Sequence, residues 1–164
     1  MNLHLFNDEK VVDRTISYFE EALPGKNKFI VLVPTRNYKP KYVKSTHRVH
    51  LVKYGTKDFW ETVGNVAEYS SIFLHSLSFL RAKFVCSITH PNIIWVVWGG
   101  DLYSTFLERK GYKIYSDTRY INKFGCKGFR KFISPFISLL KNIEFKTYSN
   151  ALKKISCFAG MYTD

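Results

Sequence analysis

Cysteine is scarce in this chain, and patterns that bind metal ions are lacking. The three cysteines, Cys86, Cys126 and Cys157, are odd in number and far apart in the sequence. No CxxC or Cys/His spacing typical of a zinc site occurs. We therefore expect no zinc site, and we interpret the cysteines as buried, reduced thiols of a cytoplasmic protein.

Long apolar runs and leader segments are also lacking, and acidic residues are few. No apolar run reaches the roughly 18–20 residues of a membrane span, and no basic region followed by an apolar stretch indicates a signal peptide. Nothing resembles GxGxxG, so no dinucleotide is indicated. Asp and Glu number 13 against 25 Lys and Arg, a net charge of +12. Such a field attracts phosphates, whether of nucleic acid, nucleotides or anionic lipid headgroups.

What the sequence does contain is an alternation of apolar strands and helical patterns. The strands are expected at residues 3–6, 29–33, 48–52, 72–75, 93–98 and 155–159. Helical spacing links Val12, Ile16, Phe19 and Leu23, and further helices are expected over 59–67, 79–85, 102–109 and 146–154. This alternation predicts an α/β fold with a Rossmann-like parallel sheet flanked by helices, in a single domain over residues 1–164.

The last third of the chain is the most basic part. Residues 105–164 carry a net charge of +8, against +4 for residues 1–104. An apolar helical stripe over 129–140 is bordered by Lys127, Arg130 and Lys131. The stripe is either a core helix against the sheet or an amphipathic helix on an anionic membrane surface.

The candidate chemistry centres on the run from Trp95 to Tyr103. Its strand stops at Trp98, and Asp101 stands close to the end of this central strand. Gly99 and Gly100 allow either a sharp turn of the backbone or the close approach of a bound substrate. Open α/β sheets bind ligands at that edge. Asp101 is either a general base for a sugar hydroxyl or the cap of the following helix.

Two histidines accompany that carboxylate. His75 ends the strand of residues 72–75 and opens onto the same edge as Asp101 if the two strands are neighbours, where it either moves a proton or only supports the site through hydrogen bonds. His4 lies inside the first strand and is either a core histidine or a site residue. Asn7 and Asp8 follow that strand, where either one can cap the next helix, and they face the same crevice.

A basic loop over residues 35–47 contains no acid. Its residues Arg36 and Lys39 are either solvated or in contact with a diphosphate or a membrane.

Four segments together resemble one known enzyme family. They are His4-Leu-Phe with Asp13-Arg-Thr and Phe19, Phe73-Leu-His-Ser76, Ile94-Trp-Val-Val-Trp-Gly-Gly-Asp-Leu-Tyr103, and Ser156-Cys-Phe-Ala159 with Thr163-Asp164. In this order they resemble the N-terminal half of the N-acetylfucosamine (4-acetamido-4,6-dideoxygalactose) transferases, which act on lipid II in enterobacterial common antigen synthesis. These enzymes form glycosyltransferase family 56.

The resemblance implies the N-terminal, acceptor-side domain of a GT-B glycosyltransferase. It implies no bound metal and no cofactor, with a nucleotide-sugar donor as substrate. It also implies an undecaprenyl-diphosphate-linked saccharide as acceptor and a peripheral location on the cytoplasmic face of the inner membrane. Asp101 or His75 would then activate the acceptor hydroxyl, and Trp98 and Tyr103 would shape the sugar-binding wall. The C-terminal donor-binding domain of the family is absent, so we expect this fragment to be inactive unless a partner chain supplies it.

Two alternatives remain at this point. The chain is a non-catalytic, acceptor-binding subunit that works with a separate donor subunit, or it is a basic nucleic-acid-binding module. Against the second, the aromatic residues follow apolar strand and helix patterns rather than a polar, basic face, so no nucleic acid is expected as a partner.

Overall fold

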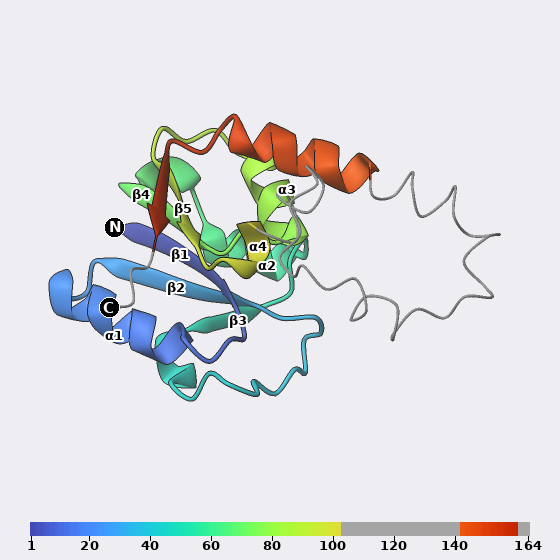
Figure 1. The fold of residues 1–164 in the computed structure, drawn as a ribbon. Helices are drawn as coiled ribbons and strands as arrows, with labels where there is room; N and C mark the ends of the chain where they lie inside the picture. Colours follow the sequence, from blue (N-terminus) through green and yellow to red (C-terminus); the bar gives the residue numbers. More distant parts are fainter. Residues whose placement is uncertain (103–141, 161–164) are drawn as a thin grey trace, which may run out of the picture.

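A computed structural model describes residues 1–102 and 142–160 of the chain (Figure 1). The described residues form a six-stranded parallel sheet in the order β3-β2-β1-β4-β5-β6. This strand order, with helices in the connections, is that of a Rossmann-like α/β fold and confirms the predicted fold class. The strands are β1 (Asn2–Asn7), β2 (Asn27–Leu32), β3 (His50–Val52), β4 (Ser71–His75), β5 (Ile93–Val97) and β6 (Cys157–Gly160).

Helices cover both faces of the sheet, as Figure 1 shows. One face carries α1 (Val12–Ala22), and the other carries α2 (Lys57–Val63), α3 (Phe79–Ser87) and a helix over residues 142–152. The shorter helical turns are η1 (Thr46–Arg48), η2 (Val66–Glu68) and α4 (Gly100–Leu102). Among the described helices, none is long and apolar enough to cross a membrane.

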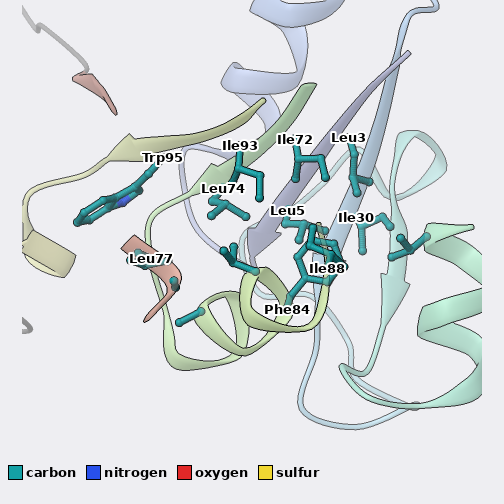
Figure 2. Close-up of a cluster of buried hydrophobic side chains, with 14 of the residues drawn as sticks. Leu3, Leu5, Ile30, Ile72, Leu74, Leu77, Phe84, Ile88, Ile93 and Trp95 are labelled. Atoms are coloured by element: carbon teal, nitrogen blue, oxygen red, sulfur yellow. The ribbon is translucent and has the colours of Figure 1, made fainter. Parts of the chain in front are cut away.

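Two hydrophobic clusters form because successive strand residues point to opposite faces of the sheet. Leu3 and Leu5 of β1 enter the larger cluster, together with side chains from α2, α3 and residues 148–155, while Phe6 enters the cluster beneath α1. Figure 2 shows the larger cluster, with Trp95 at one end of it. Each fully buried leucine contributes about 1.5–3 kcal/mol, so these clusters hold the strand ends in fixed positions.

Most predicted elements are confirmed to within two residues. Among the strands, β3 begins at His50 rather than at residue 48 because residues 46–48 form η1. Thr56 caps α2 by accepting from the amide of Phe59 at 3.2 Å. However, α2 ends at Val63, since Gly64 adopts a φ of 71°, and Val66 begins a separate turn.

The predicted cap of α1 is wrong. The residue before α1 is Val11, and no side chain caps that end. Asp8 instead accepts hydrogen bonds from the basic loop, as described below. The last helix is already formed at residue 142, four residues earlier than predicted.

Several predicted features lie outside the described residues. They are the remainder of the 102–109 helix, the 129–140 stripe, Tyr103, Cys126, Lys127, Arg130, Lys131, Thr163 and Asp164.

Candidate functional site

The strand order reverses between β1 and β4, and this reversal defines the candidate site. From β1 the chain runs outward to β2 and β3, and it then returns to add β4, β5 and β6 on the other side. The connections that follow β1 and β4 therefore run to opposite sides of the sheet. Open α/β sheets bind ligands in the crevice that forms between two such connections. Asn7 ends β1 at this edge, and His75 ends β4.

Asp101 joins the ends of β4 and β5. Its Oδ2 accepts from the Leu77 amide at 2.8 Å and from the Trp95 indole Nε1 at 2.7 Å. Its Oδ1 accepts from the amides of Trp98 at 3.2 Å and Leu102 at 3.1 Å. A carboxylate has about four lone-pair positions, and here four N–H donors occupy them. This arrangement places Asp101 at the same edge as His75 and favours a structural clamp over a free base.

His75 is the buried titratable group at this edge. Its side chain is 2% exposed, and its ring stacks on Phe6 with 3.9 Å between ring centroids. Nε2 lies 3.1 Å from Nδ1 of His4, whereas Nδ1 has no hydrogen-bond partner. Burial, together with the nearby charges of His4 and Arg81, holds the pKa of His75 well below its ordinary value. The imidazole is therefore neutral at pH 7.

His4 continues the contact away from the site. It is fully buried, and its Nε2 lies 3.1 Å from Oδ1 of Asn27. Its ring stacks on Phe73 with 4.7 Å between centroids. Burial lowers its pKa to about 4 despite the opposing effects of Asn27 and Glu20. The structure thus places His4 behind His75, as a hydrogen-bonded core histidine.

Arg81 is the residue that the sequence analysis missed. It lies on α3 and is fully buried, and its Nη2 donates to Oγ of Ser76. Nε and Nη1 have no partner. Burial lowers the pKa of Arg81 to about 10, although Glu9, Asp101 and Tyr148 act in the opposite direction, so the guanidinium stays charged at pH 7. Ser76 itself has a φ of 65°, a conformation unusual for a residue other than glycine.

Trp98 completes this group. Its indole is 6.5 Å from the His75 ring, centroid to centroid, at an interplanar angle of 70°. Its Nε1 is also buried without a partner. Gly99 follows with a φ of 85°, and a Cβ built there meets nothing within 4 Å. Gly99 is therefore required for the turn rather than for close approach of another group.

The unpartnered polar atoms thus gather in one place. In residues 1–102 and 142–160, every buried side-chain nitrogen or oxygen without a partner belongs to His75, Arg81 or Trp98. His75 ends β4, Arg81 follows it on α3, and Trp98 directly follows β5. Buried polar groups are normally satisfied because an unpaired one costs about 1–3 kcal/mol, so their concentration at the switch point marks this edge as the candidate functional site.

A cavity of about 310 Å³ lies at the same edge of the sheet, although His75, Arg81 and Trp98 do not line it. It lies at the carboxyl ends of β1 and β2 and at the first turn of α3. Its lining residues are Asn7, Asp8, Leu32, Val33, Pro34, Tyr38 and Leu80. Leu80 immediately precedes Arg81, and Asp8 immediately precedes Glu9, whose charge acts on Arg81. The cavity and the buried guanidinium are therefore linked only through residues that are adjacent in the sequence.

The basic loop is fixed next to the cavity by two carboxylates. Asp8 accepts from the Tyr38 hydroxyl at 2.8 Å and from the amides of Lys41, Tyr42 and Val43, and Asp13 accepts from the amides of Lys44 and Ser45. Burial raises the pKa of Asp8, but these hydrogen bonds outweigh that effect and lower it overall. The predicted loop residues Arg36 and Lys39 are exposed.

Comparison with protein-family models found no matching family, and comparisons with curated proteins and with solved structures found no significant match. Within the part of the chain that the structure describes, no group of three His, Cys, Asp or Glu residues is placed to hold a metal ion. The site is described by its own geometry: a neutral histidine with one unpartnered ring nitrogen, a buried guanidinium and an indole donor at the switch point.

Proposed function

We propose that this chain is the acceptor-side domain of a glycosyltransferase. The enzyme transfers a deoxy-amino sugar, or a related hexose, from a nucleotide-sugar to an undecaprenyl-diphosphate-linked saccharide. The observation that supports this most strongly is the set of unpartnered nitrogens on His75, Arg81 and Trp98 at the switch point. The same edge carries the motifs that resemble the N-acetylfucosamine transferases.

The chemistry of these nitrogens suits a saccharide. A neutral His75 offers a lone pair at Nδ1, while Arg81 and Trp98 offer only N–H donors. A sugar hydroxyl both donates and accepts, so it satisfies groups of both kinds. In the transfer, the acceptor oxygen bonds to the anomeric carbon of the donor, and its proton passes to His75 Nδ1. The bond from that carbon to the phosphate oxygen breaks, and the nucleoside diphosphate leaves with the bonding electrons.

The remaining roles follow from position. Trp98 forms a wall of the saccharide site, and the exposed Arg36 and Lys39 contact phosphate groups at an anionic membrane surface. The enzyme is peripheral on the cytoplasmic face of the membrane. A second Rossmann-like domain, on the same or another chain, holds the nucleotide-sugar. Asp101 fixes the strand ends that carry the site.

Vesicle binding tests this proposal. We expect the chain to sediment with vesicles that contain an undecaprenyl-diphosphate-linked disaccharide more strongly than with anionic phospholipid vesicles of equal charge. His75→Asn should remove that difference, whereas His50→Asn, at an exposed position on β3, should not. Equal sedimentation with both vesicles, or preferential binding of a single-stranded oligonucleotide, would overturn the proposal.

A further inference from the structure

We infer that a series of hydrogen bonds fixes the tautomer of His75. The series runs from the last turn of α1 through Asn27 and His4, and it leaves Nδ1 of His75 unprotonated, as a hydrogen-bond acceptor. His4 and Asn27 are then positioning residues for a ligand hydroxyl. The identity of that hydroxyl as a saccharide group rests on the proposed function, but the tautomer itself does not.

The orientation of the Asn27 amide is fixed by α1. Its Nδ2 donates to the carbonyl oxygens of Phe19 at 3.0 Å and Leu23 at 2.8 Å, and to Oε1 of Glu20 at 3.0 Å. All three partners are acceptors only. Rotating the amide by 180° would bring Oδ1 against these oxygens, so Oδ1 must face the sheet. There it also accepts from Asn2 at 3.3 Å.

This orientation decides where His4 carries its proton. Since Asn27 Oδ1 can only accept, the His4 nitrogen that faces it at 3.1 Å, Nε2, must be the one that bears hydrogen. A second proton on Nδ1 would place a charge on a fully buried ring among the aromatic rings of Phe19, Phe29 and Phe73. His4 is therefore neutral, and its Nδ1 carries a lone pair.

The same reasoning determines which nitrogen of His75 carries the proton. His4 Nδ1 accepts, so His75 Nε2 must donate across the 3.1 Å that separate them. A neutral imidazole carries one N–H, which leaves Nδ1 of His75 without a proton. That nitrogen is the buried, unpartnered atom at the switch point. Backbone carbonyls at the end of α1 thus determine the hydrogen-bonding character of the site at the opposite edge of the sheet.

The fixed tautomer makes His75 selective for ligand groups that can donate a hydrogen bond. A hydroxyl or amide N–H can donate to His75 Nδ1, whereas an ionised phosphate or carboxylate oxygen presents only lone pairs and is repelled there. Among the residues around His75, Arg81 is positively charged, and the nearest titratable ring is His4. The proton that His75 gains in the transfer step makes it an imidazolium whose Nε2–H still bonds to His4, so the relay persists during the reaction.

Imidazole nitrogen NMR on the ¹⁵N-histidine-labelled chain at pH 7.5 tests the relay directly. We expect Nδ1 of His75 and Nδ1 of His4 to show unprotonated shifts and both Nε2 atoms to show protonated shifts. A protonated Nδ1 on His75 overturns the inference, whatever the vesicle assay gives.

Two substitutions at His4 provide the matched comparison. Gln can accept from His75 through Oε1 and donate to Asn27 through its amide nitrogen, so His4→Gln should keep Nδ1 of His75 unprotonated. Met fills a similar volume without polar hydrogen atoms, so His4→Met should give a mixture of His75 tautomers and weaken disaccharide vesicle binding about five-fold, the equivalent of one hydrogen bond.

The outcomes separate the two proposals. Predicted tautomers without saccharide binding leave the relay intact and overturn the glycosyltransferase proposal. Saccharide binding together with a protonated Nδ1 on His75 would overturn the relay and leave the glycosyltransferase proposal intact. An unchanged His75 tautomer in folded His4→Met also overturns the relay; if that variant does not fold, the shifts of the unsubstituted chain decide alone.

Discussion

The carboxylate of Asp101 accepts from the amide of Leu77 at 2.8 Å and thereby ties the loop after β5 to the loop after β4. Leu77 lies two residues beyond His75, and the same carboxylate oxygen binds the indole of Trp95 from within the core. This one side chain therefore fixes the relative positions of the two strand ends that carry His75 and Trp98.

Asp101→Asn should therefore destabilise the fold. The asparagine replaces one acceptor oxygen with an NH₂ group, which faces two N–H donors and leaves them unsatisfied. We expect a loss of about 1–3 kcal/mol in the free energy of unfolding, measured by urea denaturation. Glu21→Gln, at an exposed position on α1, is the control. Unchanged stability would show that the four hydrogen bonds of Asp101 do not hold the strand ends together.

The clamp also shows what could be predicted from the sequence. The unbroken apolar run before Trp98 predicted a buried strand because continuous apolar character is typical of a parallel sheet covered on both faces. The expectation that His75 and Asp101 share an edge is confirmed, since it needed only the pairing of two neighbouring strands. That Asp101 meets four N–H donors depends on loop geometry after both strands, which no local pattern encodes.

Arg81 and Asp8 were beyond sequence reasoning for related reasons. Arg81 is surrounded by groups that are distant in sequence, including Glu9, Asp101 and Tyr148. Its only local sign is a basic residue between Leu80 and Ala82. Asp8 binds loop amides more than 30 residues away, so a local rule assigned it to the nearest helix instead. The end of α2 at Gly64, by contrast, follows a rule that the sequence already displays.

Arg81→Met should separate stability from binding. The guanidinium is buried with two nitrogens unpartnered, and replacing such a charge with an apolar side chain is often neutral or stabilising. We expect the free energy of unfolding to stay the same or rise by about 1 kcal/mol, while binding to disaccharide vesicles falls. Lys146→Met, exposed on the helix over 142–152, is the control for both measurements. A stability loss above about 2 kcal/mol would show that Arg81 mainly supports the fold.

Gly99→Ala should destabilise the turn after β5 through backbone strain alone. The φ of 85° is unfavourable for alanine, and the added methyl group meets nothing within 4 Å. We expect a loss of about 1 kcal/mol in urea denaturation. Gly160→Ala is the matched control, because its surroundings are equally open and its φ is not in the left-handed region. Equal effects of the two substitutions would contradict this account.

Acid should destabilise the protein through the buried histidine pair. In the folded state the pKa of His4 is about 4 and that of His75 is also depressed, whereas both are near 6.5 when unfolded. The unfolded chain therefore binds more protons below pH 6.5, and stability that is complete above that pH is lost as the pH falls toward 4. For His4 alone the loss by pH 4 is about 3 kcal/mol.

Urea denaturation between pH 7.5 and 5 measures this effect. The carboxylates Asp8, Asp13 and Glu20, whose pKa values are lowered by hydrogen bonds, contribute mainly below this window. His4→Gln removes one of the two buried imidazoles and should make the decline with falling pH shallower, while His50→Asn should leave it unchanged. A free energy of unfolding that stays constant from pH 7.5 to 5 would show that the folded chain accommodates the imidazolium, and that the pair does not hold His75 neutral.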